Sequence, residues 1–246
     1  MKPGRPFRWE IVIKVGGSLE NGRSLPRVLG RIARLARRRR ILVIPGGGRF
    51  ADLVRAERTR LSLDEAGAHR MALRAMEQYG LLLAGLCPAA KAVGDLGSAR
   101  RLAARGRTPV LLVAPILERS RRLERSFRLT SDSIAAFIAG RVRAPRLVLV
   151  KSRPGGDGLP LRVGALRELA RRGVVDPLFP ALAPRRSDVR IIDGTDAAGW
   201  EGLLAEEARE AGGPVRPRAG RRGRRSPGPD RGRRRGRRRR ARRGSR

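Results

Sequence analysis

The residues from Ile11 to Leu19 combine a buried strand with groups that can bind an anion. The run before and around Lys14 is made of Ile and Val, which favour a buried strand. Gly16 and Gly17 follow at once, and because they lack Cβ atoms their backbone N–H groups can approach an anion closely. Lys14, near the end of the strand, can reach the same anion as a point charge. This segment is therefore a candidate phosphate site.

A second segment repeats this design. The apolar run from Ile41 to Pro45 is followed by three glycines, Gly46, Gly47 and Gly48, before a helical pattern begins. Two strands that each end in a glycine loop predict two phosphate cradles side by side. Such a pair suits phosphoryl transfer between two phosphate-bearing molecules.

The elements that must position these residues alternate along the chain. Apolar runs predict strands at 9–15, 41–45, 90–93, 110–113, 147–150 and 189–192. Helical spacing predicts helices at 24–36, after 48, and at 64–85, 98–105, 134–139, 163–172 and 196–211. Residues 118–128 are expected to be an exposed loop, and 174–183 have no clear assignment. The alternation predicts an α/β fold with three layers, α/β/α, around a mainly parallel central sheet.

The charge of the chain is strongly positive and unevenly distributed. The 246 residues include 58 Lys and Arg against 22 Asp and Glu, a formal net charge of +36. Residues 214–246 hold 17 Arg and one Asp and have almost nothing to bury, so a disordered basic tail is expected there, after a single α/β domain at 1–213. The tail could bind nucleic acid without reading its sequence, or have no function.

Cysteine usage and hydropathy suggest a cytoplasmic protein. Cys87 is the only cysteine, so no intrachain disulfide can form, as is usual in a reducing compartment. No apolar run reaches the roughly 18–20 residues that span a membrane. The basic N-terminus lacks the long apolar region of a signal peptide.

Several common phosphate, metal and hydrolase motifs are missing from the sequence. There is no G-x-x-x-x-G-K-[ST] loop, no dinucleotide fingerprint, no His and Cys cluster for zinc, and no G-x-S-x-G elbow. Three segments instead resemble the amino-acid kinase superfamily, and in order they are Lys14-Val15-Gly16-Gly17-Ser18, Pro45-Gly46-Gly47-Gly48 and Thr130-Ser131-Asp132-Ser133-Ile134-Ala135-Ala136. The resemblance implies that superfamily's fold.

A narrower resemblance is to the small kinases of methanofuran biosynthesis. It is carried by residues 48–52, 68–72 and 75–80 and by Val175-Asp176-Pro177-Leu178-Phe179-Pro180. These kinases convert aminomethylfuran-methyl phosphate, a phosphomonoester, into a diphosphate with ATP. The resemblance therefore implies ATP and Mg²⁺ as cofactors, a small phosphorylated substrate and a homo-oligomer.

The resemblance also assigns roles residue by residue. It places Lys14 at the transferring γ-phosphoryl and Lys151 at the ATP phosphates, with Asp132 orienting both lysines. Further contacts to ATP are implied for Gly16, Gly17, Ser18, Asp157 and Gly158, and contacts to the acceptor for Gly46, Gly47, Gly48, His69 and Ser131. No protein residue is expected to be a metal ligand.

Other interpretations stay open at this point. Asp132 could be a plain helix cap and Lys14 a solvated strand end. His69, the only histidine, could be structural or could face the acceptor. The acceptor itself could be UMP, isopentenyl phosphate or an amino-acid carboxylate, or the protein could be a polyanion-binding protein that acts through its tail.

Overall fold

A computed structural model describes residues 6–21, 24–120, 123–152 and 160–210 of the chain. The strands are β1 Ile11–Val15, β2 Ile41–Pro45, β3 Ala90–Val93, β4 Thr108–Leu111, β5 Arg146–Lys151 and β6 Asp188–Asp193. The helices are the short 3-10 helix η1 Gly17–Asn21, α1 Ser24–Ala36, α2 Gly48–Leu61, α3 Glu65–Leu86, α4 Leu96–Ala104, α5 Ala114–Glu118, α6 Ser131–Val142, α7 Val163–Arg171, α8 Phe179–Leu182 and α9 Ala197–Glu210.

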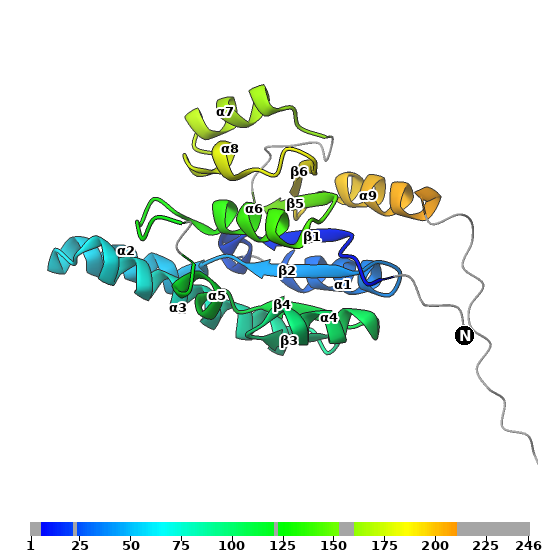
Figure 1. Cartoon of the computed structure of the whole chain (residues 1–246), viewed down its shortest axis with the longest axis horizontal. Coiled ribbons are helices and arrows are strands. Elements are labelled where there is room, and N and C mark those ends of the chain that lie inside the picture. The colour runs from blue at the N-terminus through cyan, green and yellow to red at the C-terminus, as the bar shows by residue number, and fades with distance from the viewer. Residues whose placement is uncertain (1–5, 22–23, 121–122, 153–159, 211–246) are drawn as a thin grey trace, which may run out of the picture. The chain divides into compact units, whose positions relative to one another are not determined.

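The strands form one parallel sheet with β1 near its middle. The order is β3-β4-β2-β1-β5-β6, and every neighbouring pair runs parallel (Figure 1). β1 pairs with both β2 and β5, so that Val15 lies opposite Pro45 on one side and Val150 on the other. The glycine loops after β1 and β2 and Lys151 at the end of β5 therefore meet at one edge of the sheet.

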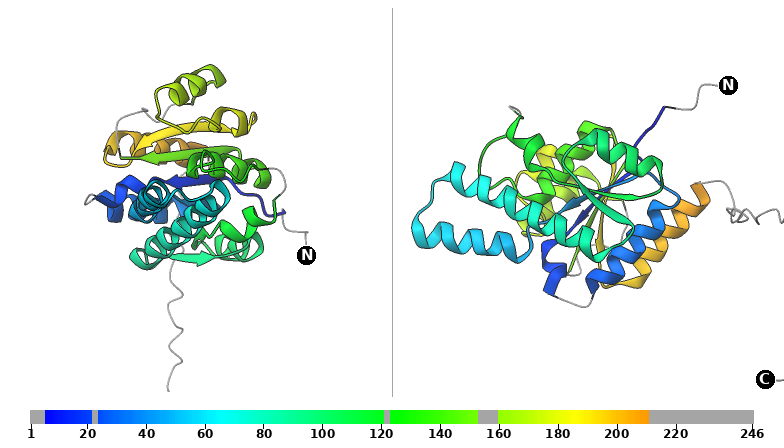
Figure 2. Two further views of the ribbon diagram at one scale, coloured as in Figure 1. Left: turned by 90° about the vertical axis from the view of Figure 1, so that its left-hand side faces the viewer. Right: turned by 90° about the horizontal axis from the view of Figure 1, so that it is seen from below.

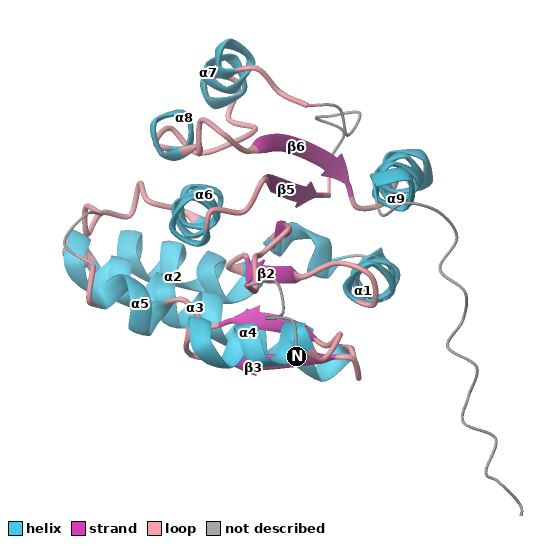
Figure 3. Cartoon of the chain, turned by 45° about the vertical axis from the view of Figure 1, so that its right-hand side comes forward, coloured by secondary structure: helices cyan, strands magenta, loops and turns pink. Residues whose placement is uncertain are grey.

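Two apolar layers cover the two faces of this sheet. Because side chains alternate along a strand, Val12 of β1 packs into one layer while Ile11, Ile13 and Val15 pack into the other. The first layer includes residues of α4, α6, α7 and α8, and the second includes residues of α1 and α9. Figure 3 shows α1 and α9 together on one side of the strands, with α6 and α8 on the other. The predicted three-layer α/β/α fold is confirmed.

The end of β4 differs from the sequence prediction. The strand was expected at 110–113, but it ends at Leu111, and Val113 takes helical backbone angles as the N-cap of α5. Pro115 stands in the first turn of α5, a position where its fixed φ and missing N–H favour a helix. Proline therefore begins a short helix here, where the sequence indicated only the end of a strand.

The segment expected to be an exposed loop is attached to the hairpin of α2 and α3. The N–H of Phe127 donates to Glu65 Oε2 at 2.9 Å, and the guanidinium of Arg58 lies 5.0 Å from the centre of the Phe127 ring. The right-hand view of Figure 2 shows α2 and α3 extending together beyond the sheet. This hairpin thus has a tertiary contact with the chain that precedes α6.

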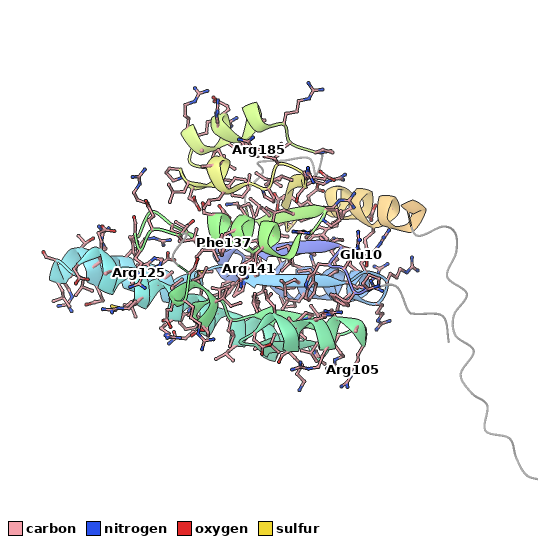
Figure 4. The ribbon with its side chains drawn as sticks, viewed as in Figure 1. Glu10, Arg105, Arg125, Phe137, Arg141 and Arg185 are labelled. Atoms are coloured by element: carbon pink, nitrogen blue, oxygen red, sulfur yellow. The ribbon has the colours of Figure 1, made fainter. Side chains whose placement is uncertain are left out.

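Charged side chains gather at the periphery of the fold. Arg105, Arg125 and Arg185 are exposed, and Figure 4 shows Arg105 at the lower right edge of the molecule. This placement agrees with the interpretation that much of the positive charge outside the tail is carried by solvated helix and loop residues. No helix within the described ranges is both long and apolar enough to cross a membrane.

Candidate active site

Two lysines project from neighbouring strands toward the same helix. Lys14 shares the face of β1 that Val12 occupies, and Lys151 shares the face of β5 that Leu147 and Leu149 occupy. Since side chains two residues apart lie on one face of a strand, both lysines point to the layer that contains α6. The alternation of the two strands therefore brings two positive charges together at the carboxyl edge of the sheet.

Asp132, in the first turn of α6, lies between these lysines. Lys14 Nζ is 2.8 Å from Asp132 Oδ1, and Lys151 Nζ is 2.5 Å from Asp132 Oδ2. The contact to Lys14 is an ion pair at short range, without the angles of a well-directed hydrogen bond. The side chains of Lys14 and Asp132 are only 5% and 6% exposed, and that of Lys151 is 18% exposed. We call these three residues the lysine cluster.

The charges of the lysine cluster determine how its members ionise. Burial opposes ionisation of Asp132, but Lys14 and Lys151 outweigh it and hold the pKa of this carboxyl below its ordinary value. The pKa of Lys151 is also lowered, first by burial and then by the charge of Lys14, although Asp132 counteracts both. Removing Asp132 would leave two buried ammonium groups close together, which is the costly case for a buried ion pair.

This geometry contradicts two simpler interpretations, in which Lys14 is a solvated strand end and Asp132 is a plain helix cap. A solvated strand end would be exposed, whereas Lys14 is almost fully buried. A plain helix cap would accept hydrogen bonds from its own helix, whereas the Asp132 carboxylate faces the two lysines. Both residues instead form a compact electrostatic group at the edge where ligands bind in open α/β sheets.

The two predicted glycine loops pack backbone against backbone. A Cβ added to Gly17 would lie 2.2 Å from the nitrogen of Gly48, and one added to Gly46 would lie 2.6 Å from the nitrogen of Gly17. Gly48 has a φ of +58°, which residues with a side chain rarely adopt. We call residues 16–18 and 46–48 together the glycine loops. Their glycines are needed for close approach of two chain segments.

Not all of the expected amides are available to a ligand. The N–H of Gly16 donates to the carbonyl of Val150, and that of Gly46 donates to the carbonyl of Val15, both at 2.8 Å. These two predicted phosphate donors are thus engaged in extending the sheet. Gly47 and Gly48 stand at the N-cap and the first position of α2, where N–H groups have no acceptor within the helix.

An acidic residue lies beside the start of α2. Glu20 Oε2 accepts a hydrogen bond from the N–H of Arg49 at 3.0 Å, and Glu20 Oε1 pairs with Arg49 Nε at 2.9 Å. A Cβ added to Gly48 would meet the same carboxylate at 2.4 Å. No sequence pattern points to this residue, because a glutamate two positions after Ser18 resembles any acid at the start of a helix.

Buried and hydroxyl side chains support the loop after β1. The hydroxyl of Tyr79, from α3, donates to the carbonyl of Gly16 at 3.1 Å, and burial raises the pKa of this phenol. The hydroxyl of Ser152 donates to that of Ser18 at 2.6 Å and so joins the loop after β1 to the end of β5. The lysine cluster and the glycine loops are therefore neighbouring parts of one site.

His69 lies apart from the glycine loops. It is ten residues before Tyr79 on α3, which is about 15 Å along a helix axis. Its ring is buried and lines a cavity of about 120 Å³ with residues of α5 and with Arg125. Burial lowers the pKa of His69, although a hydrogen bond with the backbone of Ser126 counteracts it. These contacts favour a structural role, and the acceptor contact implied by resemblance stays a prediction.

Comparison with known proteins agrees with this geometry. The profile of the amino acid kinase family matches residues 9–155, which include β1, both glycine loops and the lysine cluster. The chain belongs to the amino acid kinase family. One relative, the [5-(aminomethyl)furan-3-yl]methyl phosphate kinase of Methanocaldococcus jannaschii, is 29% identical over 178 residues, which cover 70% of this chain and 81% of the relative.

Solved structures of amino acid kinases share the fold. Uridylate kinase from Archaeoglobus fulgidus superposes with a TM-score of 0.60 at 21% identity, over 80% of this chain and 95% of that one. Aspartate kinase from Synechocystis gives a TM-score of 0.56 at 15% identity, over 76% of this chain and 38% of that one. At these identities the likeness shows the fold alone. With the family match, it makes this protein an ATP-dependent kinase.

The structure of this amino acid kinase reveals the contacts of one further residue that no sequence pattern indicates. Asp176, between α7 and α8, is 8% exposed and accepts hydrogen bonds from residues at the start of α6. In the sequence, Asp176 stood only within the segment 175–180 that resembles the small kinases, as an acidic residue before a proline. Its partners on α6 are more than forty positions away, so no local pattern could reveal these contacts.

Three other predictions have different outcomes. Ser131 is half-buried as the first residue of α6, next to Asp132, and its acceptor contact stays a prediction. Asp157 and Gly158 lie outside the described residues. The basic segment 214–246 also lies outside them, so its expected disorder and polyanion binding stay predictions.

Proposed function

We propose that this kinase transfers the γ-phosphoryl of ATP to a small phosphomonoester, [5-(aminomethyl)furan-3-yl]methyl phosphate, to give a diphosphate for a methanofuran-type cofactor. The observation that carries the proposal is the lysine cluster beside two packed glycine loops at one sheet edge. The acceptor is proposed from the relative in M. jannaschii, which is a kinase of this furan phosphate.

The lysine cluster is proposed to bind the transferring group. Lys14 would neutralise the γ-phosphoryl as charge builds up on its oxygens, and Lys151 would bind the neighbouring ATP phosphates. Asp132 would hold both ammonium groups in place before ATP arrives, so that little reorganisation remains at the moment of transfer. The first loop would contribute the amides of Gly17 and Ser18, while Gly16 would serve through close packing.

The second glycine loop is proposed to bind the acceptor. The N–H groups of Gly47 and Gly48 stand at the positive end of α2, where a phosphate is stabilised by the helix dipole. Gly46 would position this loop through its bond to Val15. Since the glycine loops touch, the two phosphates would lie side by side in line for transfer.

The chemistry requires little from the protein beyond alignment and charge. An ionised phosphomonoester is already a nucleophile, so no strong general base is needed, and its oxygen forms a bond to the γ-phosphorus as the bond to the bridging oxygen of ADP breaks. Mg²⁺ would neutralise ATP oxygens. Among the described residues no three His, Cys, Asp or Glu side chains are placed to share a metal, and Asp132 faces two cations, so few protein ligands are proposed.

An ADP-release assay tests the acceptor. The full chain would be given ATP, Mg²⁺ and a panel that contains the furan phosphate, UMP, isopentenyl phosphate and aspartate. We expect the highest kcat/KM with the furan phosphate, and ADP release slower by about 10²–10³ in a Lys14→Ala control. Faster turnover of UMP or of a carboxylate would contradict the proposed acceptor and assign the protein to another group within the amino acid kinase family.

A further inference from the structure

The N-terminus of α6 is held by a carboxylate from a distant part of the chain. Thr130, the N-cap residue of α6, makes no side-chain hydrogen bond to its own helix. Its hydroxyl donates to Asp176 Oδ2 at 2.7 Å, and the same oxygen accepts the N–H of Ser133 at 2.9 Å. Asp176 thus satisfies a helix-end donor that a local cap would usually satisfy.

The second oxygen of Asp176 completes this contact. Oδ1 accepts a hydrogen bond from the hydroxyl of Ser133 and another from the N–H of Leu178 at 3.1 Å. The residue is 8% exposed, so its charge is buried, but four donors surround it. Buried polar groups with all partners in place fix the geometry of the elements that they join. Here they join the start of α6 to the start of α8.

This arrangement leaves Asp132 available for the lysines. An aspartate in the first turn of a helix can fold back onto nearby backbone N–H groups. In α6 the N–H of Ser133 is already bonded to Asp176, and the Asp132 carboxylate instead lies between Lys14 and Lys151. Asp176 therefore caps the helix, and Asp132 holds the two lysine side chains.

Asp176 also acts on Lys151 through its charge. Among the described residues, the charged groups that act on Lys151 are Lys14 from β1, Asp132 from α6 and Asp176 from the segment before α8. Burial and Lys14 lower the pKa of Lys151, whereas the two carboxylates raise it. Neutralising Asp176 should therefore make Lys151 lose its proton at lower pH.

We propose that Asp176 is a positioning residue of this kinase, because it fixes the start of α6 so that Asp132 can hold Lys14 and Lys151 at the phosphates. The inference rests on the proposed role of the lysine cluster in binding ATP. It does not depend on which acceptor is used.

The test compares Asp176→Asn with a matched helix-cap variant, Asp95→Ala. Asp95 caps α4 by accepting the N–H of Ser98 at 2.8 Å, at a helix outside the site. Both variants should lose thermal stability. Only Asp176→Asn should lower kcat, by about tenfold to a hundredfold, as expected when reacting groups are displaced. Equal kcat in the two variants would make Asp176 a structural residue and overturn the proposal.

A second pair of variants examines one contact of Asp176. Thr130→Val removes the hydroxyl that donates to Asp176 at nearly constant size, and Thr130→Ser keeps it. We expect a several-fold lower kcat for the valine variant and recovery in the serine variant. This pair decides the question even if Asp176→Asn does not fold, since unchanged kcat in Thr130→Val would contradict the proposal.

A measurement without any acceptor separates this proposal from the assignment of function. The chain has four lysines, Lys2, Lys14, Lys91 and Lys151, so NMR of protein labelled with 13Cε-lysine can follow Lys151 directly once Lys151→Arg has assigned its signal. We expect its titration midpoint at lower pH in Asp176→Asn than in the wild type and in Asp95→Ala. An unchanged midpoint would contradict the inference, whereas failure of every phosphomonoester in the ADP assay would contradict only the proposed acceptor.

Discussion

The lysine cluster and the glycine loops are fixed by different kinds of contact. In the lysine cluster, long side chains from two strands are held by one buried carboxylate. In the glycine loops, backbone packs directly on backbone and no side chain could be inserted between Gly17 and Gly48. The lysine cluster is therefore held by electrostatic attraction between side chains, and the glycine loops are held by close packing of the backbone.

This difference explains why the two halves should tolerate change differently. A buried ion pair loses charge when one member is substituted, but the chain around it can keep its course. In a tight backbone contact the chain cannot keep its course, since any added Cβ must push one segment away from the other. We therefore expect changes in the glycine loops to remove activity more completely than changes in the lysine cluster.

The largest effect is expected for Gly17→Ala. The new Cβ would lie 2.2 Å from the nitrogen and 2.7 Å from the Cα of Gly48, so the loops must separate. Turnover should fall by more than a thousandfold, beyond the ~10²–10³ effect of losing one preorganised electrostatic group. Gly30→Ala in α1 is the matched control, because nothing lies within 4 Å of its added Cβ. Near-normal kcat in Gly17→Ala would show that the loops can part without cost.

A smaller effect is expected for Lys14→Ala. The variant removes one charge at the transferring group, so kcat should fall by about 10²–10³, while Lys151 still compensates Asp132. Lys91→Ala, at an exposed position of β3, should leave steady-state kinetics unchanged. If the two variants had the same kcat, Lys14 would have no role in transfer.

The pH dependence of ATP use should follow Lys151. Its pKa is lowered by burial and by Lys14, so its positive charge is lost as pH rises through a value below the ordinary ~10.4. The kcat/KM for ATP should therefore decline by about tenfold per pH unit on the alkaline side. Lys151→Arg keeps the charge to higher pH, and its alkaline limb should move upward. A limb that stays in place would assign the titration to another group.

Glu20→Gln should strengthen binding of the acceptor, whereas the variants above weaken catalysis. The amide keeps an acceptor for the N–H of Arg49 but removes a negative charge beside the proposed phosphate position. The KM for the phosphomonoester should fall by about two- to fivefold, the size of a charge effect of 0.3–1 kcal/mol at a helix N-terminus. Glu57→Gln, elsewhere on α2, serves as the control. A rise in this KM would mean that Glu20 supports acceptor binding through Arg49.

The smallest kinetic effect is expected for His69→Ala. Because the ring is buried against α5 and the segment before α6, its loss should lower the free energy of unfolding by roughly 1–3 kcal/mol. The KM values for ATP and for the acceptor should stay within about twofold, below 0.5 kcal/mol. A tenfold rise for the phosphomonoester alone would restore His69 to the acceptor site and extend that site along α3.

The sequence was most informative where local pattern and chemistry coincide. Lys14 and Lys151 stand at the ends of apolar strands, and the predicted partnership of Asp132 with both lysines is present in the structure. The sequence could not reveal Asp176, because its contacts to α6 depend on how the segment between α7 and α8 folds back. It also could not show that the N–H groups of Gly16 and Gly46, two predicted phosphate donors, instead extend the sheet.

The central place of β1 has a consequence for synthesis of the chain on the ribosome. β1 is made before the other strands of the described sheet, and β2 can pair with one of its edges soon afterwards. Its other edge waits for β5, since Ile11 pairs with Arg146. Until then an apolar strand with unpaired N–H and C=O groups remains open to other nascent chains. Expression at low temperature or with chaperones should therefore raise the yield of folded protein more than the small size of the chain would suggest.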